Sequence, residues 1–165
     1  MREELTRLGV KELTSPDDVD TAFEVAQDQT MLLIINSVCG CAAANARPAV
    51  AMVQQVEDQP DAYTTVFAGQ DVEATARARE HLAGIPPSSP FMALIKDGEP
   101  VFLLERRHIE GRSANAIAAD LQQAFQKYCN GANADSADDG SVERPDVGTS
   151  PDANNDLPPT FRSIR

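Results

Sequence analysis

Apolar residues recur along the chain at two spacings, which predict alternating helices and strands. Val19, Phe23 and Ala26 lie at helical spacing after the segment 15–18, Ser-Pro-Asp-Asp. That segment is typical of a helix start, because serine caps the helix, proline suits its first turn and acids lie near its positive end. Residues 31–36 are a short apolar run, which indicates a strand buried on both faces of a sheet.

The rest of the first 129 residues continues this alternation. Ala49, Met52, Val53 and Val56 predict an amphipathic helix that follows residue 41, and we expect Pro48 to kink it. Further elements are a strand at 63–68, a helix at 71–82, strands at 91–96 and 101–104, a helix at 113–129 and a short first strand near 10–13. The turn signal Asp-Gly at 97–98 predicts a hairpin between the two later strands. This order is thioredoxin-like: an α/β fold with a mixed central sheet and helices on both faces.

The composition changes after the last predicted helix. Residues 130–165 are rich in Asp, Asn, Ala, Ser, Gly and Pro and contain few large apolar residues. Such a segment cannot bury enough apolar surface to offset its ordering entropy. We therefore expect a folded domain over residues 1–129 and a disordered acidic tail over residues 130–165.

The net charge of the chain limits the classes of partner that it can bind. The formal net charge of −12 argues against a nucleic-acid partner, because contact with phosphates needs clustered Lys and Arg. No apolar run approaches the roughly 18 residues of a membrane helix, and residues 1–10 lack the apolar core of a secretory signal. We expect a cytoplasmic protein without a membrane partner, and either a monomer or a homodimer.

The chain has three cysteines, and two of them stand close together at Cys39 and Cys41. The pair lies between the predicted buried strand and the helix that follows it. Amides and the dipole at a helix start favour a thiolate and lower the pKa of a cysteine there. Gly40 suits the tight loop between the two sulfurs. We expect a disulfide across one intervening residue to be strained and easily reduced, and so suited to exchange or isomerisation.

Two other interpretations of the pair stay open. Two close thiolates could form half of a zinc site, although a closed site needs four ligands and only Cys129, His81 and His108 remain. The two cysteines could instead be buried and unreactive.

Several segments together resemble one family of proteins. They are Ser-Val-Cys-Gly-Cys-Ala-Ala at 37–43, Ala-Arg-Pro-Ala at 46–49, Val-Phe-Ala-Gly-Gln-Asp at 66–71, Pro-Ser-Ser-Pro at 87–90 and the 107–111 segment that begins Arg-His. In this combination residues 1–129 resemble the bacilliredoxins, which are bacterial thioredoxin-like thiol-disulfide oxidoreductases, also described as isomerases. The sequence departs from the pattern at Ala44, where many members have glycine, and in its tail.

The resemblance implies a reaction and roles for the cysteines. It implies removal of bacillithiol from S-bacillithiolated proteins, with bacillithiol as a co-substrate and no bound cofactor or metal. Cys39 would attack, and Cys41 or a second bacillithiol would resolve the mixed disulfide. Reasoning from the residues alone does not say which sulfur attacks first, since Cys41 lies nearer the helix.

Substrate-positioning roles follow for Gly40, Ser89, Pro90, His108 and Arg47. The resemblance implies that the Ser89–Pro90 bond is cis and faces the cysteines. His108 would border the site and stabilise a thiolate or pass a proton, or else be an exposed structural histidine. Arg47 could bring positive charge to the site, but its position six residues after Cys41 puts it on another helical face and favours a surface or capping role.

Two alternative functions remain open. The first is a general protein disulfide isomerase or reductase that acts on disulfide-containing proteins without preference for bacillithiol. The second is a redox-inactive module that binds a thiol or a metal through the two cysteines.

Overall fold

A mixed five-stranded sheet forms the centre of the computed structural model, which describes residues 2–130 and 141–145. The strands are β1 (Lys11–Glu12), β2 (Thr30–Asn36), β3 (Ala62–Phe67), β4 (Phe91–Lys96) and β5 (Glu99–Leu104). Their spatial order is β1-β3-β2-β4-β5, in which β3 is parallel to β1 and β2, while β4 is antiparallel to β2 and β5. The predicted mixed sheet is therefore confirmed, including the short first strand.

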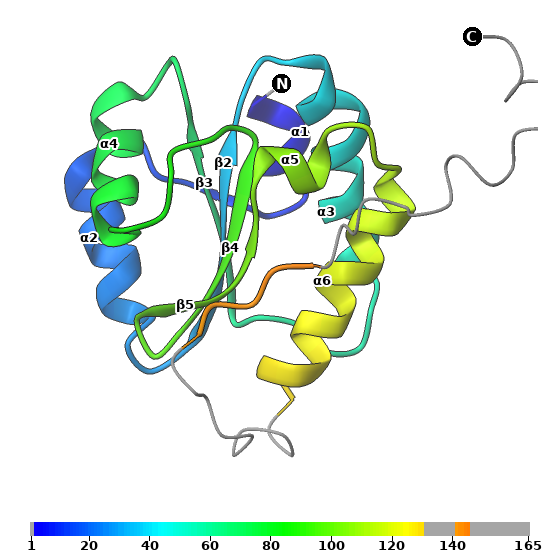
Figure 1. Ribbon diagram of the computed structural model, residues 1–165. Coiled ribbons are helices and arrows are strands. Elements are labelled where there is room, and N and C mark those ends of the chain that lie inside the picture. The colour runs from blue at the N-terminus through cyan, green and yellow to red at the C-terminus, as the bar shows by residue number, and fades with distance from the viewer. Residues whose placement is uncertain (1, 131–140, 146–165) are drawn as a thin grey trace, which may run out of the picture.

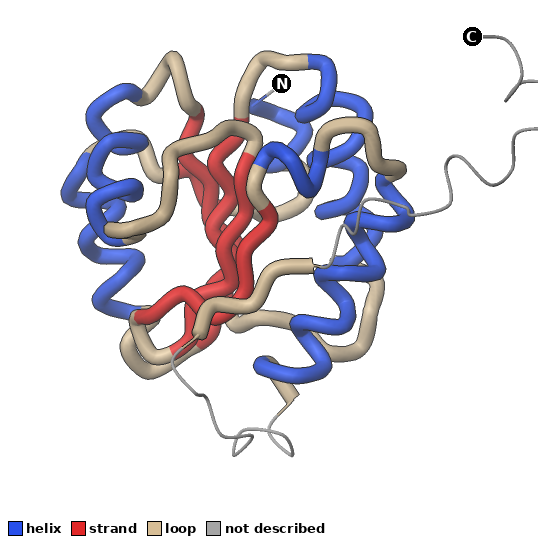
Figure 2. The backbone as a smooth tube through the Cα atoms, in the orientation of Figure 1, coloured by secondary structure: helices blue, strands red, loops and turns tan. Residues whose placement is uncertain are grey.

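Helices cover both faces of this sheet (Figure 1; Figure 2). The helical segments are α1 (Arg2–Thr6), α2 (Pro16–Val25), the π-helix η1 (Ala42–Ala46), α3 (Arg47–Val53), α4 (Val72–His81), α5 (Arg106–Ile109) and α6 (Ala114–Tyr128). Helices α2 and α4 pack on one face, and α1, α3 and α6 pack on the other. No helix within the described residues is long and apolar enough to span a membrane.

Local sequence explains most of these elements. The Ser15 hydroxyl accepts a hydrogen bond from the Asp18 amide, and the Asp18 carboxylate accepts one from the Ser15 amide, which forms the capping box at the start of α2. Asp97 and Gly98 both have positive φ, as a tight hairpin turn between β4 and β5 requires. The predicted helix starts and the hairpin are thus confirmed.

The segment around Pro48 differs from the prediction. The chain forms the π-helix η1 and then α3, with Pro48 in the first turn of α3. Proline is tolerated there, because the first amides of a helix have no intrahelical acceptor. Instead of a kink at Pro48, the helical segment therefore has a wide π-helical turn before the proline.

Residues 141–145 lie beside the outer strand β5, which the composition did not predict (orange in Figure 1). Glu143 pairs with Phe102 in parallel: its amide donates to the Val101 carbonyl over 3.0 Å, and its carbonyl accepts from the Leu103 amide over 2.8 Å. Lys127 on α6 also forms an ion pair with Glu143. This part of the predicted tail is therefore ordered, while residues 131–140 and 146–165 lie outside the described residues.

Candidate functional site

Cys39 and Cys41 lie where β2 ends and the helical segment of η1 and α3 begins. The structure joins them as a disulfide, with their Cα atoms 5.5 Å apart. Both side chains are half-buried, so the interpretation of two buried cysteines is wrong for this pair. Their position at the start of a helix agrees with the prediction.

Gly40 itself has no left-handed backbone, contrary to the expectation that the loop needs glycine for its backbone angles. A Cβ atom added at this exposed position would meet no other atom within 4 Å. The space beside Gly40, between the two cysteines, is therefore open.

Two hydrogen-bond donors point at the sulfur of Cys39. The Ser37 hydroxyl lies 3.2 Å from Cys39 Sγ, and the Ala42 amide lies 3.4 Å from it. The Cys39 carbonyl also accepts from the Ala42 amide over 3.1 Å, so Cys39 caps the start of the helical segment. Within the described residues no hydrogen bond reaches Cys41 Sγ. Donors of this kind stabilise a thiolate more than a thiol.

Arg47 lies under this loop and not on the surface, which corrects the predicted surface role. Its side chain is only 4% exposed. Its Nη1 lies 3.3 Å from the Asn36 side-chain oxygen and 3.3 Å from the Ser37 carbonyl, and its Nε lies 2.6 Å from a Glu4 carboxylate oxygen. Because the Asn36 oxygen also accepts from the Ser37 amide over 2.9 Å, Arg47 holds the backbone that leads into Cys39.

Pro90 begins the strand next to β2. The Ser89–Pro90 peptide bond is cis, as the resemblance implies. Phe91 pairs with Ile35 in the antiparallel register, so Pro90 and Ser89 lie beside the end of β2 and the start of the cysteine loop. Pro90 is buried and Ser89 is half-buried, which leaves Ser89 the more accessible of the two.

His108 differs from both roles predicted for it. It lies in the short helix α5, is 2% exposed, and its Nδ1 accepts a hydrogen bond of 2.9 Å from the Glu105 amide. Burial, followed by the positive charge of Arg107, lowers the pKa of His108 below its ordinary value of 6.5. A neutral ring that accepts at Nδ1 caps α5, and within the described residues it forms no hydrogen bond with Cys39 or Cys41.

The remaining candidates lie apart from the cysteine pair. Cys129 ends α6 as a free, half-buried thiol, and burial raises its pKa to about 11. His81 stacks on Phe23 and binds Asp20 between α2 and α4. No group of three or more His, Cys, Asp or Glu side chains in residues 2–130 and 141–145 is arranged to hold a metal ion.

Three residues around the pair were missed by the sequence argument: Glu4, Asn36 and Ser37. Ser37 carried a readable signal, because a hydroxyl two residues before a helix-capping cysteine can reach its sulfur. Glu4 carried none, since its contact with Arg47 joins segments 43 residues apart.

The comparisons with known proteins agree with this geometry. A family model described as disulphide isomerase matches residues 1–129. A bacilliredoxin of Salinibacter ruber is 61% identical over 99% of this chain and 94% of its own length. The chain belongs to the bacilliredoxin family. A bacilliredoxin of Halalkalibacterium halodurans is 48% identical over 78% of this chain and 88% of its own length.

Solved structures support the fold of this bacilliredoxin family member. Fasciola hepatica thioredoxin superposes with a TM-score of 0.50 over 71% of this chain and 97% of the thioredoxin, at 17% identity. The predicted thioredoxin-like fold is therefore confirmed. Family and fold together identify the chain as a thiol-disulfide oxidoreductase.

Proposed function

We propose that this protein removes bacillithiol from S-bacillithiolated proteins, with Cys39 as the attacking thiolate. The observation that carries the assignment is the pair of donors at Cys39 Sγ, the Ser37 hydroxyl and the Ala42 amide. A thiolate is the nucleophile in disulfide exchange, and these donors favour ionisation of Cys39 over Cys41.

The reaction proceeds through two exchanges. Cys39 Sγ attacks the bacillithiol sulfur of the client's mixed disulfide, which breaks the bond to the client and releases the client thiolate to take a proton from water. Cys41 Sγ then attacks Cys39 Sγ and releases bacillithiol, which leaves the Cys39–Cys41 disulfide; on this route the cysteine pair loses two electrons and the client's mixed disulfide gains them. Alternatively, a second bacillithiol attacks the sulfur of the bound bacillithiol, which leaves Cys39 reduced and releases bacillithiol disulfide, so that bacillithiol supplies the two electrons.

Trapping the intermediate tests the assignment of the two sulfurs. A Cys41→Ala variant, incubated with a bacillithiolated client, should accumulate a mixed disulfide at Cys39 that mass spectrometry detects. A Cys39→Ala variant should not. If only the Cys39→Ala variant forms an adduct, the two roles are exchanged.

A second candidate function is general disulfide isomerisation or reduction, which the description of the matching family favours. Rates on scrambled ribonuclease and oxidised insulin, set against rates on a bacillithiolated client, separate the two functions. Comparable rates on all three substrates would favour the general enzyme. A strong preference for the bacillithiolated client supports the proposed function.

Mass spectrometry under graded thiol and disulfide ratios tests the redox-inactive alternative. The proposed function requires the Cys39–Cys41 disulfide to form at some ratio; its absence at every ratio would leave only a binding module. An enzyme of this kind needs a reducing compartment, and we assign it to the cytoplasm.

A further inference from the structure

Arg79 on α4 differs from the other arginines of the structure. Each of the others within residues 2–130 and 141–145 forms an ion pair with Asp or Glu. Arg79 forms none, and its Nε is buried without a hydrogen-bond partner. In a chain with a net charge of −12, a guanidinium without a carboxylate beside it is available for an anion that comes from outside.

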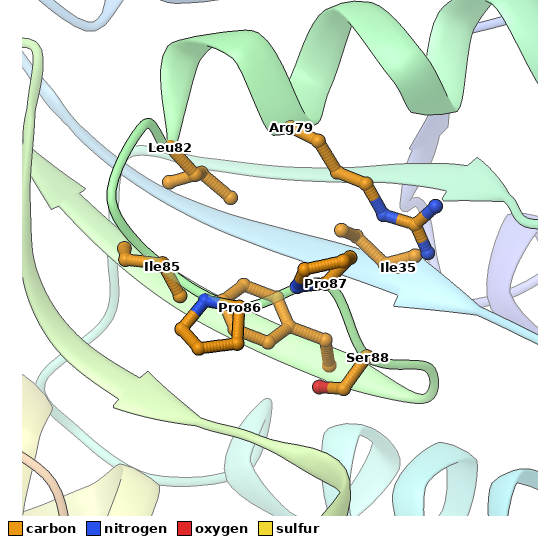
Figure 3. Close-up of a pocket in the computed structure, with 8 residues that line it drawn as sticks. Ile35, Arg79, Leu82, Ile85, Pro86, Pro87 and Ser88 are labelled. Atoms are coloured by element: carbon orange, nitrogen blue, oxygen red, sulfur yellow. The ribbon is translucent and has the colours of Figure 1, made fainter.

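This guanidinium lies in a pocket between α4 and the segment that leads into β4 (Figure 3). The Arg79 side chain extends from the helix toward Ile35 and Pro87, and Ser88 lies at the edge of the same pocket. The space between the lining residues is about 10 Å³, roughly what one water molecule needs, and it is partly open to solvent. A small charged group can reach the guanidinium from solvent, but the space is too small for a whole side chain.

The pocket lies next to the cysteine site through the sheet register. Ile35 pairs with Phe91, and both line the pocket. Along β2, Ile35 is followed by Asn36 and Ser37 and then by the cysteine loop. Along the neighbouring segment, Ser88 and Phe91 flank the cis Ser89–Pro90 bond. The pocket that holds Arg79 therefore adjoins both segments that lead to the site, the one into the cysteine loop and the one that carries the cis proline.

We propose that Arg79 binds a carboxylate of the low-molecular-weight thiol that reacts at the cysteine pair. This inference rests on the proposed function, and it names a specificity-determining residue of the same site: a cation for a carboxylate of the thiol that reacts there. Guanidinium and carboxylate are geometrically matched for paired hydrogen bonds. A strongly acidic protein repels an anionic thiol at a distance. Arg79, a cation without a carboxylate partner, offsets that repulsion in the pocket beside the cysteine site.

A charge series of small thiols tests the proposal on the oxidised full-length protein. The probes are 3-mercaptopropionate, 2-mercaptoethanol and cysteamine, which are anionic, neutral and cationic. In each case one thiolate attacks Cys39 Sγ and releases the Cys41 thiolate, and a second thiolate releases reduced Cys39 as the probe leaves as its own disulfide. Reduction rates are compared per thiolate present, since the three thiols differ in acidity.

The decisive quantity is the rate with 3-mercaptopropionate divided by the rate with 2-mercaptoethanol. Arg79→Gln should lower this ratio about threefold or more, and Arg79→Lys should lower it less, because charge remains while paired bonding is lost. Arg77→Gln is the matched control: Arg77 lies on the same helix, pairs with Asp20 and Glu80, and does not line the pocket. Its ratio should equal that of the unaltered protein.

Three results would overturn the inference. They are an unchanged ratio in Arg79→Gln, an equal loss in Arg77→Gln, or an equal loss of rate with all three thiols. In each of these cases the thiols still reduce the Cys39–Cys41 disulfide, so the proposed function stands. If no thiol reduces the Cys39–Cys41 disulfide, the proposed function fails together with the inference.

Discussion

The Ser37 hydroxyl donates a hydrogen bond to Cys39 Sγ over 3.2 Å, across only one intervening residue. The Ser37 carbonyl is held from below by Arg47, and its amide by the Asn36 side chain. The hydroxyl, amide and carbonyl of Ser37 thus connect the buried Arg47 and Asn36 to Cys39 Sγ. The position of this donor is fixed before any substrate arrives, which lowers the cost of forming a thiolate.

Removal of the Ser37 hydroxyl should weaken Cys39 as a nucleophile. In Ser37→Ala we expect the pKa of the Cys39 thiol to rise and the exchange rate at pH 7 to fall roughly fivefold, because a hydrogen bond to a charged group is lost. The two proteins should converge at alkaline pH, where both thiols are ionised. Thiolate absorbance against pH, measured in the Cys41→Ser background, checks this.

Ser113→Ala is the control for that variant. Ser113 caps α6 through the Ala116 amide, so its loss should lower thermal stability and leave the Cys39 titration unchanged. An equal shift in both variants would mean that Ser37 acts through general stability alone.

The contact between Glu4 and Arg47 predicts acid sensitivity. The hydrogen bond that Glu4 accepts from Arg47 lowers the pKa of Glu4 below the ordinary value of 4.5. A lowered folded-state pKa means that the stabilisation is complete above the unfolded value and is lost as pH falls through the folded value. Glu4→Gln should therefore lower the melting temperature at pH 7, and the difference should shrink below about pH 4.

Glu3→Gln offers the comparison, because Glu3 lies on the same helix as Glu4 and forms an exposed ion pair with Arg7. We expect no measurable change in melting temperature from Glu3→Gln at either pH. If both variants lose equal stability, the buried position of Arg47 does not strengthen the stabilisation that its contact with Glu4 provides.

His108 predicts a second pH dependence near neutrality. Its pKa is lowered by burial, so the unfolded chain binds the proton more readily than the folded protein. Stability is then complete above about pH 6.5 and falls as pH drops below that value. His108→Gln should flatten the melting-temperature curve between about pH 5 and 7.

Cys129 should be a slow thiol. Burial raises its pKa to about 11, so little thiolate is present at pH 8. Peptide mapping after brief treatment of the reduced protein with iodoacetamide should find Cys39 modified well before Cys129. Cys129→Ser should keep full exchange activity, and a loss of activity would assign Cys129 a redox role.

Truncation tests the contact of residues 141–145 with β5. A chain that ends at residue 130 loses two backbone hydrogen bonds to β5 and the ion pairs of Glu143 and Arg144. We expect it to lose about 2 kcal/mol of unfolding free energy. Hydrogen exchange at the Leu103 amide should also accelerate. A chain that ends at residue 145 keeps these contacts, and it should match the full protein in both measurements.

The elements that could be predicted from the sequence are those with a repeating pattern. The strand at 31–36 is predictable because it is a continuous apolar run, and the helix at 113–129 because its apolar residues recur at helical spacing over several turns. Helices α1 and α5 are five and four residues long, too short for any periodicity to show. They matter nevertheless, since α1 supplies Glu4 and α5 is built around His108.

Arg47 shows why the site was predicted only in part. Its expected face assumed an α-helical turn after Cys41, but the chain forms a π-helix over Ala42–Ala46. The wider turn changes the direction in which later side chains point, and it turns Arg47 inward. The residue types of the site were readable from local spacing, whereas contacts between distant segments were not.

Residues 141–145 have one further consequence, which concerns aggregation through the edges of the sheet. A sheet offers unpaired amides and carbonyls along its two outermost strands, and such rows promote aggregation. Here one outermost strand, β1, has only two residues, and residues 141–145 pair with the other. This arrangement leaves an exposed strand of another molecule little free backbone to pair with along either edge of the sheet.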